Sequence, residues 1–121
     1  MENEDFGFKN LIVWQKAVDF ADHVIELTEY LDTSGKHYRL IEQIEASSAS
    51  VSQNIAEGKG RNSKKEFKQY LYISRGSLYE TVTLLNIFHR RKWITANQLN
   101  ERENEAIEIA KMTKGLINTL Y

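Results

Sequence analysis

The stretch Q-I-E-A-S-S-A-S-V-S-Q-N-I-A-E-G-K-G-R, residues 43–61, decides how this chain folds. Ile44, Val51 and Ile55 fall on one face of a helix with 3.6 residues per turn. Between them the side chains are small, which makes the helix thin and lets a neighbour approach closely: Ser47, Ser48, Ala49, Ser50 and Ser52. Gly58 and Gly60 then predict the end of the helix, because glycine readily adopts the positive φ at which helices commonly stop.

Apolar seams at helical spacing run through the rest of the chain. A helix from about residue 11 has the seam Trp14, Ala17, Ala21, Val24, Thr28 and Leu31. The helix predicted from about residue 37 or 38 to 57 has the seam Leu40, Ile44, Ser47, Val51, Asn54 and Gly58. The helix predicted from residue 63 has two adjacent seams, namely Phe67, Leu71, Ser74, Leu78, Thr81, Leu85 and Phe88, and Tyr70, Ile73, Ser77, Glu80, Leu84 and Ile87. A last helix buries Leu99, Ala106, Ile109, Ala110, Thr113, Leu116, Ile117 and Leu120. The second seam of the third helix also suits contact with a second subunit.

Local signals mark where these helices begin. Ser63 with Glu66, and Thr95 with Gln98, have the spacing of capping boxes, in which two residues satisfy each other's free backbone donors. Residues 32–36 have the composition of a turn. The mid-helix Gly76 costs about 1 kcal/mol relative to alanine, which predicts close helix packing at that point.

Four helices of roughly 20–28 residues with short connections predict an all-α, antiparallel up-down-up-down four-helix bundle. The 121 residues form one expected domain, 1–121, in which the acidic residues 1–10 are a partly ordered lead-in that Phe6 and Phe8 can hold down.

Composition points to the cytoplasm. The chain has no cysteine, so disulfides and thiolate metal sites are excluded, and a reducing compartment fits. The start Met1-Glu-Asn-Glu-Asp5 is not a signal peptide, and no run of about 18 apolar residues predicts a membrane span.

The net charge of −1 hides an asymmetry along the chain. Residues 1–58 carry four Lys/Arg against eleven Asp/Glu, a net −7, whereas residues 59–92 carry nine against two, a net +7. Such a block indicates either an anionic partner or attraction between parts of the protein, within or between protomers.

No catalytic or metal-binding constellation is evident. Di-iron bundles need Glu-x-x-His pairs, which are absent, and His23 with Glu26 is better explained by a solvated acidic face. The pairs Glu42/Glu45 and Glu105/Glu108 have the spacing of magnesium-dependent nucleotide pyrophosphohydrolases but lie on charged outer faces. No nucleophile motif or glycine-rich phosphate loop occurs. We therefore predict no catalytic residue, no metal and no cofactor, and metal-dependent nucleotide turnover remains a third alternative.

A polar set lies near the junction between the helix predicted to end at residue 57 (helix 2) and the helix predicted from residue 63 (helix 3): Asn54, Glu57, Arg61, Arg75 and Glu80. Glu57 near a helix C-terminus and Glu80 in an apolar seam both need partners, and the two arginines are the candidates. The set is interpreted either as a structural network between helices 2 and 3 or as a ligand or subunit contact.

The basic loop continues into a basic helix start, a pattern that contacts phosphates without reading bases. The candidate nucleic-acid-binding residues are Lys59, Arg61, Lys64, Lys65 and Lys68, with Tyr70 and Tyr72 nearby. No helix-turn-helix or other reader motif accompanies them.

Three segments together resemble a known family: F-K-N-L-I-V-W-Q-K-A (8–17), N-I-A-E-G-K-G-R-N-S-K-K-E-F (54–67) and I-S-R-G-S-L-Y-E (73–80). The chain resembles the bacterial four-helix-bundle proteins encoded in intervening sequences of 23S ribosomal RNA genes. The resemblance implies a ring-like homopentamer without enzymatic activity, related to nucleic-acid-binding accessory proteins of diversity-generating retroelements. Family members often have arginines near Glu45 and Ala46 and a proline at Ser52, and the accessory proteins are markedly basic.

The leading hypothesis is a non-enzymatic, homo-oligomeric scaffold whose partner is RNA or a ribonucleoprotein. The alternative is a protein-interaction module that binds no nucleic acid, in which the basic segment docks on the acidic face of helix 1 or 2 of a neighbour.

Overall fold

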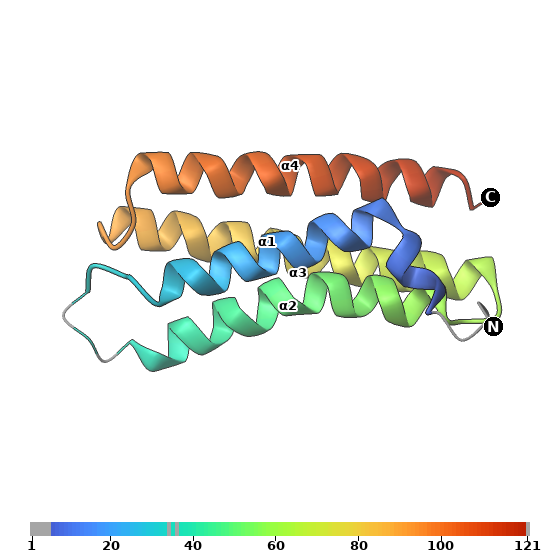
Figure 1. Ribbon diagram of the computed structural model, residues 1–121, viewed down its shortest axis with the longest axis horizontal. Coiled ribbons are helices and arrows are strands. Elements are labelled where there is room, and N and C mark those ends of the chain that lie inside the picture. Colours follow the sequence, from blue (N-terminus) through green and yellow to red (C-terminus); the bar gives the residue numbers. More distant parts are fainter. Residues whose placement is uncertain (1–5, 34, 36, 121) are drawn as a thin grey trace.

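The computed structural model describes residues 6–33, 35 and 37–120. A short 3₁₀ helix, η2 (Gly7–Asn10), precedes α1 (Ile12–Thr28), α2 (Tyr38–Lys59), α3 (Lys64–Arg90) and α4 (Ala96–Asn118). Within these ranges the structure contains no β-strand. Each long helix packs against two others, in the cyclic order α1, α2, α3, α4. The predicted all-α, antiparallel up-down-up-down bundle is therefore confirmed (Figure 1).

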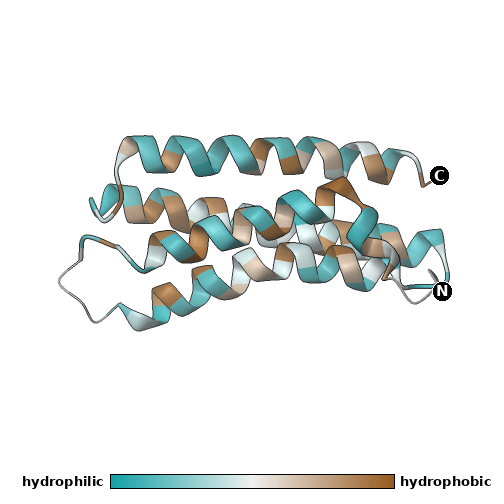
Figure 2. Ribbon diagram, viewed as in Figure 1, coloured by the Kyte–Doolittle hydropathy of each residue, from teal (hydrophilic) through white to brown (hydrophobic). Residues whose placement is uncertain are grey.

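One continuous apolar core joins all four helices. It is centred on large side chains that are fully buried, among them Phe20, Ile44, Ile55, Leu71, Phe88 and Ile109. All seven residues of the first α3 seam, from Phe67 to Phe88, are buried as predicted. The outward faces of the helices are mostly hydrophilic, most visibly along α4 (Figure 2). The recurrence of apolar residues at helical spacing is therefore sufficient to predict which side chains form the core.

The end of α2 differs from the expectation. Gly58 lies inside the helix, and Gly60, which caps it, has a right-handed φ of −79°. Among the described glycines only Gly35 has a positive φ, 84°. The prediction that Gly58 and Gly60 supply positive φ is therefore wrong.

Gly58 has a different function, which is to let α3 come close. A β-carbon added at Gly58 would lie 2.6 Å from the Cβ of Tyr70 and 3.0 Å from the ring of Phe67. Gly76 is the opposite case, because a β-carbon there would meet nothing within 4 Å. Close packing was thus predicted at the wrong glycine.

The two capping boxes also differ from each other. Thr95 and Gln98 form the full reciprocal pair at the start of α4. At the start of α3 the Ser63 hydroxyl accepts from the Glu66 backbone N–H, but it also donates to the Glu66 carboxylate at 3.2 Å. The second half of the predicted box is therefore replaced by a side-chain hydrogen bond.

The end of α3 is a Schellman motif built on a lysine. Lys92 has φ 65°, and its N–H bonds to the His89 carbonyl at 2.9 Å, while the Trp93 N–H bonds to the Phe88 carbonyl at 2.9 Å. The accompanying apolar contact joins Trp93 and Phe88, whose ring centroids are 5.2 Å apart. The motif turns the chain sharply into α4.

We expect Lys92→Gly to raise the free energy of unfolding by about 1 kcal/mol, because glycine adopts positive φ without the steric cost that lysine bears. For a chain of this size the midpoint of thermal unfolding should rise by about 3–5 °C. Circular dichroism at one protein concentration measures it. Arg91→Gly, one residue earlier at φ −77°, is the control and should give no increase. An equal increase in both variants would contradict this account.

The predicted lead-in and turn are described in part. Residues 1–5, Ser34 and Lys36 lie outside the described residues. The remainder of the lead-in forms η2, where the Phe8 ring lies 5.1 Å from the Trp14 ring. Of the described helices, none is long and apolar enough to cross a membrane.

Candidate nucleic-acid interface

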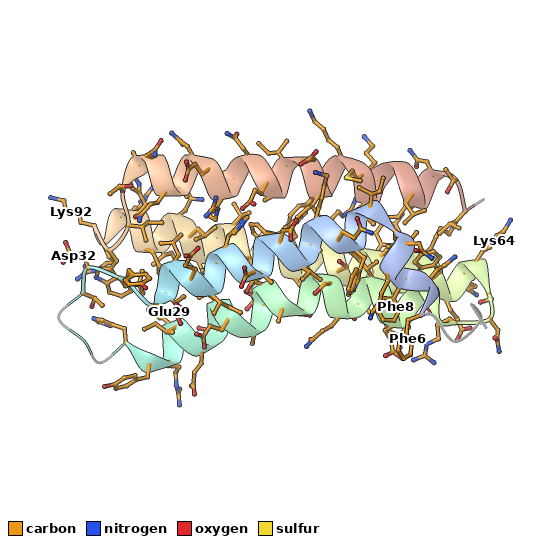
Figure 3. All side chains as sticks on the ribbon, viewed as in Figure 1. Phe6, Phe8, Glu29, Asp32, Lys64 and Lys92 are labelled. Atoms are coloured by element: carbon orange, nitrogen blue, oxygen red, sulfur yellow. The ribbon has the colours of Figure 1, made fainter. Side chains whose placement is uncertain are left out.

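The residues from Lys59 to Lys68 lie at the end of the bundle where α2 connects to α3. We call the predicted phosphate-binding set at this end the basic end: Lys59, Arg61, Lys64, Lys65 and Lys68. Lys64 is seen at one end of the molecule, and Lys92 lies at the opposite end (Figure 3). The long axis of α3 therefore separates the basic end from the second cationic group, Arg90, Arg91 and Lys92.

Arg61, a member of the basic end, contacts residues on both sides of the α2–α3 connection. Its Nη2 donates to Glu57 Oε2 and to the Tyr70 hydroxyl, both at 2.6 Å, and its guanidinium lies 4.9 Å from the centre of the Tyr70 ring. It therefore ties the last turn of α2 to the first turns of α3. Because Nη2 makes both hydrogen bonds and the guanidinium lies near the Tyr70 ring, Arg61 is a structural residue as well as a surface cation.

The lysines of the basic end are more accessible. Lys59, Lys64 and Lys65 are exposed, and Lys68 is half-buried. The Lys59 ammonium lies 6.0 Å from the centre of the Phe67 ring. Within the part of the chain that the structure describes, neither Lys64 nor Lys65 forms an ion pair. Both side chains are therefore exposed cations at the start of α3.

Small polar side chains join α2 and α3 along their contact. Ser47 Oγ and Thr81 Oγ1 are 2.8 Å apart, Ser50 Oγ and Ser77 Oγ are 2.9 Å apart, and Ser74 Oγ donates to the Val51 carbonyl at 2.7 Å. Hydroxyl groups can meet in this way only when two backbones are close. The small residues of 43–61 thus serve the predicted close approach.

Asn54 belongs to this seam and not to a network with the arginines. Its Nδ2 donates to the Ser50 carbonyl and to Ser50 Oγ, both at 2.8 Å. The predicted polar set therefore divides into separate parts. Glu57 and Arg61 are brought together, whereas Asn54 is linked to the serine seam.

Arg75 and Glu80 do not meet. Glu80 is exposed, so the expectation that it needs a partner within an apolar seam is wrong. The Arg75 guanidinium instead lies over two tyrosine rings, 4.9 Å from the centre of Tyr72 and 5.9 Å from that of Tyr79. Sequence reasoning missed Tyr79, although residues 65, 68, 72, 75 and 79 share a 3-4-3-4 spacing that could have revealed a common face.

The solvated acidic face that the sequence predicts around His23 is present in Asp19, Asp22 and Glu26, which are exposed, but His23 itself is half-buried and contacts α4. His23 Nδ1 is 2.5 Å from Glu105 Oε2, and the other oxygen of Glu105 is 2.7 Å from Arg102 Nε. Lys16 and Glu108 approach to 3.4 Å in the same groove. No local pattern indicates the two pairs between α1 and α4, because His23 and Glu105 are 82 residues apart and Lys16 and Glu108 are still further apart, whereas Arg102 and Glu105 are a local i,i+3 pair within α4. The contacts of His23 with Glu105 and of Lys16 with Glu108 join α1 to α4.

The chain is similar to known proteins in both structure and sequence. A crystal structure of a protein of unknown function from the S23 ribosomal protein family of Bacteroides thetaiotaomicron superposes with a TM-score of 0.81 and is 28% identical in sequence. The match covers 88% of this chain and 98% of the other. No curated protein sequence matches the chain. The sequence profile described as 23S rRNA-intervening sequence protein matches residues 9–115. This chain therefore belongs to the 23S rRNA-intervening sequence protein family.

Proposed function

We propose that the protein is a non-enzymatic scaffold in the cytoplasm that assembles into a homo-oligomer, a pentamer as the family resemblance implies. In this proposal it binds RNA or a ribonucleoprotein through the basic end. The observation that carries the proposal is the unpaired state of Lys64 and Lys65 within the described residues, at an exposed end of the bundle. Lysines in such a position bind phosphates as point charges, without base specificity.

The proposal of self-association is supported by the second α3 seam. Only Leu84 of this seam is buried, while Ile73 and Ile87 are 52% and 40% exposed. They lie beside the half-buried Ser77, on the side of α3 that faces α2. Apolar side chains at regular spacing beside small residues suit contact with a second copy of the helix pair.

We expect the triple variant Lys64→Glu, Lys65→Glu, Lys68→Glu to abolish the retardation of a structured RNA in a native gel at low salt. Each replaced lysine removes an attraction to phosphate and adds a repulsion, so affinity falls steeply. The matched control changes the same amount of charge at the opposite end: Arg90→Glu, Arg91→Glu, Lys92→Glu. It should keep most of the binding. Absence of retardation by the wild-type protein at low salt contradicts RNA binding itself.

The second candidate is a protein-interaction module, and the exposed acidic face of α1 favours it. That face carries Asp19, Asp22, Glu26 and Glu29 at 3-4-3 spacing, all exposed. The basic end of a neighbouring subunit could dock there. Native mass spectrometry of protein purified with and without nuclease treatment separates the candidates. Nucleic acid that co-purifies supports the scaffold, whereas an oligomer that dissociates with salt and carries no nucleic acid supports the module.

A further inference from the structure

One face of α3 combines cations with exposed aromatic rings, beginning at the basic end. The α3 stripe consists of Lys65, Lys68, Tyr72, Arg75 and Tyr79. Their 3-4-3-4 spacing places them on one side of the helix. The two tyrosines are 44% and 56% exposed, and they are seven positions apart in the sequence, which is about 10 Å along the helix.

The α3 stripe contains cations and aromatic rings but no carboxylate. At 100° per residue, both carboxylates of α3, Glu66 and Glu80, fall roughly 100° or more from the middle of the stripe. The guanidinium of Arg75 lies over the rings of Tyr72 and Tyr79, so three flat groups follow one another along the helix. Nucleobases stack on such aromatic and guanidinium planes, while the lysines attract the backbone.

Beyond Tyr79 the surface becomes an apolar groove of about 440 Å³ between α3 and α4. Tyr79, Val82, Ala106, Ile107 and Ala110 contribute to its walls. The carboxylate of Glu103 at its rim accepts a hydrogen bond from Asn86 Nδ2 at 2.8 Å. Tyr79 borders this groove, and none of the residues that line it is a cation, so the stripe ends at residue 79.

From this arrangement we infer that the α3 stripe binds a single-stranded RNA segment, with bases stacked on Tyr72 and Tyr79 and phosphates near Lys65 and Lys68. The inference rests on the proposed RNA-binding function and specifies its substrate class. A duplex keeps its bases stacked on one another and is contacted through its phosphates and 2′-hydroxyl groups, so the lysines can bind it but its bases cannot stack on the tyrosines. Single strands are therefore distinguished from duplexes by the two rings.

Fluorescence anisotropy with a labelled, unstructured RNA oligonucleotide and a blunt RNA duplex of the same length tests the inference. We expect Tyr72→Leu with Tyr79→Leu to weaken binding of the single strand by about tenfold or more, since each stacked base contributes substantially. Binding of the duplex should change less than about twofold, and the salt dependence of single-strand binding should stay the same, because no cation is removed.

Two control variants define what the rings contribute. Tyr72→Phe with Tyr79→Phe keeps the aromatic planes and should bind the single strand like the wild type. Tyr30→Leu with Tyr38→Leu removes two even more exposed tyrosines, 77% and 73%, from the opposite end and should leave binding unchanged. Circular dichroism confirms that each variant is folded.

The outcomes separate the inference from the proposed function. If the leucine variant loses single-strand and duplex binding equally, or loses neither, stacking on the α3 stripe is wrong while RNA binding stands. If the phenylalanine variant fails as badly as the leucine variant, stacking is also wrong. If the wild-type protein binds only the duplex, the inference falls alone, and if it binds neither RNA, the inference and the proposed function fall together.

Discussion

Gly58→Ala should lower the free energy of unfolding by about 2 kcal/mol, although alanine is the better helix former. A β-carbon at this position lies 2.6 Å from the Cβ of Tyr70 and 3.3 Å from the Phe67 carbonyl oxygen. Both atoms are fixed to the α3 backbone, so the clash is relieved only if α2 and α3 move apart. Overpacking costs about 1–3 kcal/mol, and a clash with atoms fixed to the backbone falls at the upper end of that range. Subtracting the roughly 1 kcal/mol that alanine gains as a helix former leaves the net loss of about 2 kcal/mol.

Gly76→Ala is the matched control, because the same substitution there meets nothing within 4 Å. It should raise the free energy of unfolding by roughly 0.5–1 kcal/mol. Urea denaturation of both variants at one protein concentration measures the difference, and the concentration is fixed because self-association shifts apparent stability. A gain of stability in both variants would show that α2 and α3 are not in close contact at Gly58.

Ser47→Leu is expected to cost about 3 kcal/mol or more. Ser47 is 5% exposed, and its hydroxyl lies 2.8 Å from Thr81 Oγ1 across the α2–α3 contact. Leucine loses this hydrogen bond, worth about 1 kcal/mol, and its side chain is two heavy atoms larger than that of serine at the point where the two backbones meet. The cost therefore combines a lost polar contact with overpacking.

Two neighbouring substitutions separate these contributions. Ser47→Ala removes only the hydroxyl and should cost about 1 kcal/mol. Ala46→Leu adds the same side chain at an exposed position one residue earlier and should change stability by less than about 0.5 kcal/mol. If Ser47→Leu costs no more than Ser47→Ala, the seam has room for a large side chain and is not closely packed.

The sequence alone predicts the exposed lysines of the candidate nucleic-acid interface, because their exposure depends only on residue type and local position. Lys64 and Lys65 are charged and follow a capping serine, so their exposure at the first turn of α3 is expected from local rules. The contacts of Arg61 were expected in part, since Glu57 precedes it by one helical turn. The bond from Arg61 to the Tyr70 hydroxyl depends on how the connection folds back, which no local rule specifies.

The 3.6-residue periodicity of apolar residues was sufficient to predict the four helices, the side of each that is buried and the bundle that they form, because the apolar side of a helix is the side that packs in the core. Phe67, Leu71 and Phe88 are buried for that reason. What faces each side chain across a contact depends on the rotation and axial offset of two helices, which belong to the tertiary structure. That is why the structure alone pairs His23 with Glu105, leaves Glu80 in solvent and makes Gly58, not Gly76, the point of closest approach.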